Sequence, residues 1–111
     1  MLETEQWVAP SDPGAQEITR LRRSIDEVNV ELLRLLERRG ALALKVMHLK
    51  QRRGIALHDR ARESAMIAEL TTQSLELYDR REIEAIFHSI FEAARSLAAR
   101  AFAGRGRGGA S

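Results

Sequence analysis

Apolar residues recur with a seven-residue period from Ile18 to about Arg53. When Ile18 is taken as position a, the d positions are all apolar, and the a positions are apolar except for two arginines. The a positions are Ile18, Ile25, Leu32, Arg39, Val46 and Arg53, and the d positions are Leu21, Val28, Leu35, Leu42 and Leu49. Because no proline interrupts it, the pattern predicts one long helix over residues 17–53 with an apolar seam along one side.

The length of this helix has a consequence for assembly. At about 1.5 Å per residue it would measure roughly 55 Å, which exceeds the diameter of a domain of this size. Two shorter helices of the same chain cannot cover such a seam completely. We therefore expect a homodimer in which each long helix packs partly against its twin.

Two shorter helices are expected after the long one. Gly54 predicts the end of the first helix, and Asp59 predicts the N-cap of a second helix that reaches about Leu75. A third helix is expected from near Arg80 to about Phe102, because apolar residues recur on one of its sides. No stretch has the alternation of a strand. The predicted fold class is therefore all-α, with one long and two shorter helices per chain in an intertwined homodimer.

The two ends of the chain differ in composition from the helical part. Residues 1–16 carry both prolines among polar residues, which predicts a flexible arm. Residues 104–111 read GRGRGGAS, which predicts a disordered glycine–arginine tail. A single helical domain is thus expected over residues 17–103.

Composition excludes several classes of function. With no cysteine, the chain can form neither a disulfide scaffold nor a thiolate metal site. The three histidines lack ligand spacing, so no metal is expected. A formal charge of +2 gives no reason to expect a nucleic-acid partner. The N-terminus lacks the pattern of a signal peptide and no apolar stretch could span a membrane, so a cytoplasmic protein is expected.

Charged side chains on the long helix suggest a binding site. Arg39 and Lys50 lie on one face, about three turns or roughly 16 Å apart along the axis. The small Ala43 and the medium-sized Val46 lie between them, which predicts a concave gap with a cation at each end. Arg22 lies on the adjoining edge, where it could approach the gap of a second copy. Three cations around one gap suit a molecule with two negative charges.

The start of the second helix adds polar groups, although other interpretations remain open. Glu63 falls in the first turn after Asp59, where the helix dipole favours a carboxylate that could accept a ligand hydroxyl. Alternatively, Asp59 is only a cap, Glu63 is a solvated charge, and Arg39 extends to the surface or pairs with a glutamate of the partner helix. The residue pattern alone does not decide between a site and these structural roles.

Four motifs together resemble the all-helical, type II chorismate mutases. They are L-R-x-x-I-D at residues 21–26, L-L-x-L-L-x-x-R at 32–39, A-x-x-V-x-x-x-K at 43–50 and D-x-x-R-E at 59–63. The resemblance covers residues 17–99. It implies three helices per chain that interlock in a dimer with two active sites. It also implies that chorismate rearranges to prephenate in one step, without a cofactor.

The resemblance also implies roles for individual residues. Arg39 and Arg22 of the second copy would hold the two carboxylates of chorismate, and Lys50 would face the breaking ether bond. Glu63, with the backbone near Asp59, would hold the ring hydroxyl. The residues implied to bind substrate are Arg22, Arg39, Val46, Lys50, Asp59, Arg62, Glu63, Ala94 and Ala98.

The third helix departs from the family pattern. The family has a glutamine or glutamate there, four residues after a small residue, that donates a hydrogen bond to the ether oxygen. One alignment puts Ala94 and Ala98 at these positions, and a shift by one residue puts Arg95 and Ala99 there. Arg95 could supply a substitute donor, but no amide is available in either alignment. The departure predicts a slow enzyme, an enzyme completed by a DAHP synthase, a non-catalytic sensor of chorismate or prephenate, or a related enzyme acting on isochorismate or 4-amino-4-deoxychorismate.

Overall fold

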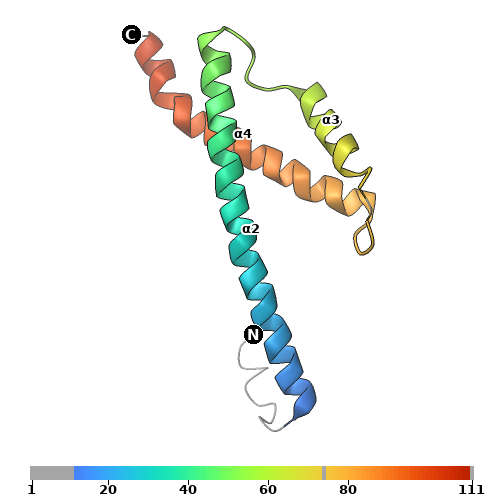
Figure 1. Cartoon of the computed structure of the whole chain (residues 1–111). Helices are drawn as coiled ribbons and strands as arrows, with labels where there is room; N and C mark the ends of the chain where they lie inside the picture. The colour runs from blue at the N-terminus through green and yellow to red at the C-terminus, as the bar shows by residue number, and fades with distance from the viewer. Residues whose placement is uncertain (1–11, 74, 111) are drawn as a thin grey trace. The chain divides into compact units, whose positions relative to one another are not determined.

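The fold is built from three helices. The computed structural model describes residues 12–73 and 75–110, with side chains described as far as residue 103. Its helices are α2 (Pro13–Arg52), α3 (Arg60–Leu70) and α4 (Arg80–Ala110), and the described residues form no strand (Figure 1). The predicted all-α class is thereby confirmed. The chain forms two compact units, residues 1–38 and 39–111, and α2 contributes to both.

The start of α2 lies earlier than the sequence pattern predicts. Asp12 acts as the N-cap, since its Oδ1 accepts a hydrogen bond of 2.9 Å from the backbone N–H of Gly14. Pro13 then occupies the first helical position, where its missing N–H costs nothing and its fixed φ suits a helix. Residues 13–16, assigned above to the arm, therefore form the first turn of α2. Residues 1–11, the rest of the predicted arm, lie outside the described residues.

The end of α2 follows the prediction made from Gly54. Gly54 has a φ of 70°, a left-handed conformation that costs glycine little. The N–H of Ile55 donates to the carbonyl of Lys50 at 2.8 Å, and the N–H of Gly54 donates to that of Gln51 at 3.2 Å. These two bonds form a Schellman motif, which satisfies carbonyls that the helix end would otherwise leave unpaired.

Asp59 caps α3 as predicted, but the helix is shorter than predicted. The Oδ1 of Asp59 accepts a hydrogen bond of 3.0 Å from the backbone N–H of Arg62. The predicted end at Leu75 is wrong, because α3 ends at Leu70. Thr71 is its C-cap, and both the backbone N–H and the hydroxyl of Thr71 donate to the carbonyl of Ile67, each at 2.9 Å.

The start of α4 is fixed by a reciprocal pair of hydrogen bonds. The backbone N–H of Glu82 donates to Asp79 Oδ1, and the backbone N–H of Asp79 donates to Glu82 Oε1, both at 2.9 Å. This capping box satisfies two N–H groups at the helix start. The backbone of α4 continues to Ala110, so it includes residues 104–110 of the predicted tail, whose side chains lie outside the description.

Packing within the second unit is sparse. Among the side chains that the structure describes, only Ile67, Phe91 and Phe102 are buried. The last turns of α2 reach α4 through an edge-to-face contact between His48 and Phe102, with ring centroids 4.8 Å apart. Gly40 allows a close approach there as well, since a Cβ at this position would lie 3.3 Å from Leu97 Cδ2. A core this small leaves most apolar surface of the chain uncovered.

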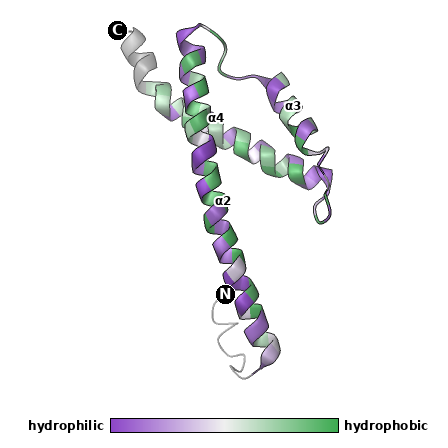
Figure 2. Cartoon of the chain, viewed as in Figure 1, coloured by the Kyte–Doolittle hydropathy of each residue, from purple (hydrophilic) through white to green (hydrophobic). Residues whose placement is uncertain are grey.

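The predicted seam is among the uncovered surface. In the first unit its a and d residues are all between 50% and 58% exposed, namely Ile18, Leu21, Ile25, Val28, Leu32 and Leu35. Figure 2 shows apolar and polar residues alternating along the whole of α2. Despite this apolar content, no described helix combines the length and hydropathy needed to cross a membrane.

Candidate functional site

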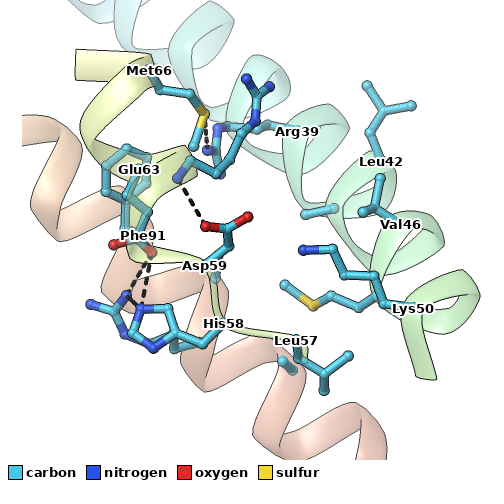
Figure 3. Close-up of a pocket in the computed structure, with 16 residues that line it drawn as sticks. Arg39, Leu42, Val46, Lys50, Leu57, His58, Asp59, Glu63, Met66 and Phe91 are labelled. Carbon is cyan, nitrogen blue, oxygen red and sulfur yellow. Dashed lines mark hydrogen bonds and ion pairs between the residues drawn. The ribbon is translucent and has the colours of Figure 1, made fainter. Parts of the chain in front are cut away.

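An open cavity of about 390 Å³ lies within the second unit, between the last turns of α2, the connection to α3, α3 itself and α4 (Figure 3). Its volume is in the range of small-molecule sites. Eight of the nine residues predicted to bind substrate line it, and these are Arg39, Val46, Lys50, Asp59, Arg62, Glu63, Ala94 and Ala98. The structure thus brings together residues that lie far apart in the sequence.

Arg39 approaches the cavity from α2 and is half-buried. Its Nη2 lies 3.9 Å from Met66 Sδ, and its guanidinium carbon lies 5.5 Å from the centre of the Phe91 ring. The aromatic face and the thioether orient the cation without neutralising it. Within the described part of the chain, Arg39 forms no ion pair with a carboxylate.

Lys50 lines the same cavity three turns further along α2 (Figure 3). Its side chain is half-buried, and no described residue forms a hydrogen bond or an ion pair with it. The wall between the two cations includes Ala43 and Val46, as predicted, together with the apolar Leu42 and Met47. Partly buried cations that form no ion pair with a described residue favour the binding of an anion.

The start of α3 supplies the opposite, acidic side of the cavity. Asp59 lines the cavity while its carboxylate holds the first turn, and the N–H of Glu63 donates to the backbone carbonyl of Asp59 at 3.1 Å. Glu63 is largely buried, with 20% of its side chain exposed. The cavity therefore joins a cationic wall on α2 to hydrogen-bond acceptors on α3.

Glu63 is held by Arg95 of α4, and His58 lies beside this pair. Arg95 Nη1 donates to Glu63 Oε2 at 2.8 Å, and His58 Nε2 lies 3.5 Å from the same oxygen. Arg95 Nη1 also lies 3.2 Å from His58 Nε2. The arginine considered above as a substitute donor therefore pairs with Glu63. His58, Met66, Phe91 and Arg95 line the cavity but were absent from the predicted set, because only the fold brings them next to α2.

The two alignments of the third helix differ in what they place at the cavity. Ala94 and Ala98 both line it, whereas Ala99 does not. The first alignment therefore agrees with the geometry of α4. Two methyl groups at these positions offer no hydrogen-bond donor to a ligand.

Arg22 is the one predicted residue that does not line the cavity. It lies on α2 in the first unit, and its approach to the cavity of a second copy remains a prediction.

A second cavity of about 420 Å³ shares His58, Glu63 and Arg95 with the first one. Arg60, Ser64 and His88 complete its lining. Although it contains two histidines and a glutamate, the described residues include no group of three or more side chains suited to hold a metal ion. The three shared residues thus form a polar partition between the two cavities.

Comparison with known proteins identifies relatives of the chain. The family model described as chorismate mutase type II matches residues 21–99. Form II of chorismate mutase from Thermus thermophilus is 36% identical with a TM-score of 0.71, over 73% of this chain and 92% of that one. Form I of the same enzyme is 36% identical with a TM-score of 0.69, over 70% of this chain and 98% of that one. A search of curated proteins found no match.

Proposed function

The chain belongs to the chorismate mutase type II family, and from this premise we propose that it converts chorismate to prephenate in the cavity of Arg39 and Lys50. One observation carries the proposal, namely that two half-buried cations line a single cavity and neither has a carboxylate partner among the described residues. Chorismate carries two carboxylates and an ether oxygen. The reaction would place the protein among the intramolecular isomerases of aromatic amino acid biosynthesis.

The rearrangement of chorismate requires only that the protein hold a reactive conformation and stabilise developing charge. The rearrangement is unimolecular, so it requires no acid, base, nucleophile or cofactor. Arg39 and Arg22 of a second copy would bind the two carboxylates and hold the compact conformer that reacts. Lys50 would stabilise the negative charge that develops on the ether oxygen as the C–O bond breaks. Glu63 and the backbone near Asp59 would bind the ring hydroxyl, and Arg62 and Val46 would contact the substrate from the sides.

The proposed enzyme is a homodimer. The seam of the first unit supports this, since its six a and d residues remain 50–58% exposed in the described part of the chain. Burying the exposed half of each would contribute on the order of 1 kcal/mol, before the cost of association. The second copy would also deliver Arg22 to the cavity. A cytoplasmic location remains a prediction from the sequence.

Ala98 supports a second candidate function. A glutamine or glutamate at this cavity position would donate to the ether oxygen, and losing one such donor costs about a hundred- to a thousandfold in rate. The protein is then either a slow mutase, or a mutase completed by a DAHP synthase, or a non-catalytic sensor of chorismate or prephenate for such a partner. Isochorismate or 4-amino-4-deoxychorismate as substrate is the remaining alternative.

A direct assay tests the proposal. Purified protein is incubated with chorismate, with and without a DAHP synthase, and prephenate formation is measured. We expect turnover by the wild type, a loss of at least about a hundredfold in Arg39→Ala, and no loss in the neighbouring, exposed Arg38→Ala. Binding of chorismate in calorimetry without turnover would favour the sensor. Turnover of isochorismate or 4-amino-4-deoxychorismate in its place would favour a related enzyme.

A further inference from the structure

We infer that Arg95 and His58 are positioning residues, which fix the Glu63 carboxylate so that one of its oxygens accepts a hydrogen bond from the ring hydroxyl of the substrate. The inference rests on the proposed function, because it assigns Glu63 to that hydroxyl. It goes further by assigning a role to two residues that lie outside the motifs of the sequence. Neither residue needs to touch the substrate for this role.

The contacts of Glu63 are distributed unequally between its two oxygens. Arg95 Nη1 and His58 Nε2 both approach Oε2, at 2.8 Å and 3.5 Å respectively. Oε1 accepts no hydrogen bond from any described residue. An ionised carboxylate is an acceptor only. Glu63 lines the cavity, and its Oε1 is thus left available for a donor on a ligand.

Arg95 is suited to hold this arrangement because it comes from a different helix. Glu63 lies in the first turn of α3, and Arg95 lies on α4 next to the cavity-lining Ala94. A glutamate side chain rotates freely in solution, whereas the planar guanidinium fixes the direction of its hydrogen bonds. The ion pair therefore ties the orientation of the carboxylate to the packing of α3 against α4.

His58 completes the arrangement by contacting Arg95. An arginine has donors and no acceptor, so the 3.2 Å contact with His58 Nε2 is a hydrogen bond when Nε2 is unprotonated. In that tautomer His58 orients Arg95, which in turn orients Glu63. The side chains of His58 and Arg95 are 40% and 41% exposed, which leaves room for their replacement without a large change in the core.

The arrangement has a consequence for specificity. An acceptor that is fixed in place binds a ligand with a donor at the matching position more tightly than a ligand without that donor. If Glu63 could rotate, its second oxygen or a water molecule could adapt to other ring substituents. Arg95 is thus expected to sharpen the choice of ring substituent as well as to support the rate.

A double-mutant cycle on the full chain tests whether Arg95 acts through Glu63. We expect Arg95→Ala to lower kcat/KM for chorismate about tenfold in the wild-type background and less than about twofold in the Glu63→Ala background. Arg95→Lys should give a value between those of Arg95→Ala and the wild type, because it keeps a cation near Oε2 but loses the planar guanidinium. His58→Ala should lose about threefold, and His58→Gln, which keeps an acceptor, should lose less. The matched control is Arg100→Ala on an exposed part of the same helix, which should change nothing.

Additive losses in the cycle would overturn the inference while the proposed function stands, because they would mean that Arg95 acts independently of Glu63. Failure of Arg95→Lys to recover activity, in a variant whose circular dichroism matches that of the wild type, would overturn it as well. If the wild type itself neither binds nor converts chorismate, the proposed function fails and the inference fails with it. The wild-type assay and the cycle therefore separate the two failures.

Discussion

The two parts of α2 follow one apolar pattern but present different chemistry. Residues 13–38 have an uninterrupted seam whose apolar residues are half-exposed, and they line neither described cavity. Residues 39–52 continue the pattern but replace its first a residue by Arg39 and add Lys50. In this second part the half-buried side chains include both cations. The same helix thus presents a half-exposed apolar surface in its first part and a cationic cavity wall in its second part.

The difference shows what a periodic pattern can and cannot indicate. A seam residue contributes through apolar area, so several neighbours share its role. A cation in the cavity contributes through a single charge at a single place, so no neighbour can replace it. We therefore expect substitutions in the second part to affect chemistry, and those in the first part to affect assembly. Four experiments examine this division, beginning with the largest expected effect.

Complementation tests whether the two parts of α2 meet across a dimer. Arg22→Ala and Lys50→Ala should each lower kcat/KM by at least about a hundredfold. In a co-expressed mixture, random pairing makes half of the dimers mixed, and one of the two sites in each mixed dimer is intact. Activity should therefore recover to about a quarter of the wild-type value. If each site is formed by one chain alone, no activity will return.

A charge on the seam should separate the copies. Leu32→Asp places a carboxylate at an a position, and it should raise the dissociation constant of the dimer by at least about a hundredfold. Val30→Asp is the matched control, since Val30 is similarly exposed but lies away from the seam. Sedimentation velocity over a range of concentrations measures both variants. Equal weakening by both would mean that the seam is not the surface that associates.

A hydrogen-bond donor introduced on α4 should raise the rate of the reaction. Ala98→Gln places an amide at the cavity, and we expect kcat to rise about ten- to a hundredfold if the ether oxygen lacks a second donor. Ala99→Gln, one position along, is the control and should leave the rate unchanged. An unchanged rate in a folded Ala98→Gln variant would mean that another group already fills this role.

The smallest effect is expected at a cap outside both cavities. Asp79→Ala removes the acceptor for the N–H of Glu82 and should lower the free energy of unfolding by about 1 kcal/mol. Chemical denaturation measures this change. Because Asp79 lines neither cavity, kcat/KM should stay at the wild-type value. A large loss of activity would indicate that the start of α4 influences the site.

The parts of the molecule that the sequence predicts well are those that depend on local physics. The seam, the glycine at the end of α2 and the cap of α3 each follow from side chains within a few residues of one another. The length of α3 was predicted wrongly, because the helix ends at Leu70 with Thr71 as its C-cap. Threonine is common within and beyond helices, so its position alone gives no clear signal.

Residues of the candidate site likewise differ in whether the sequence could predict them. Arg39 and Lys50 could be predicted because both lie on one face of one helix, where the number of residues between them determines their separation. The contacts that His58 and Arg95 form could not be predicted, because they depend on how a connection and a distant helix pack. No periodicity relates residues that are 37 positions apart.

The double position of Asp59 makes the folding of α3 and the occupancy of the cavity interdependent. The carboxylate of Asp59 accepts a hydrogen bond from the N–H of Arg62, and Asp59 also lines the cavity where a ligand would bind. We expect a ligand that binds there only while α3 is folded to slow the local opening of the helix. Amide hydrogen exchange at Arg62 and Glu63 becomes a reporter of occupancy, readable even for a ligand that is bound and never transformed.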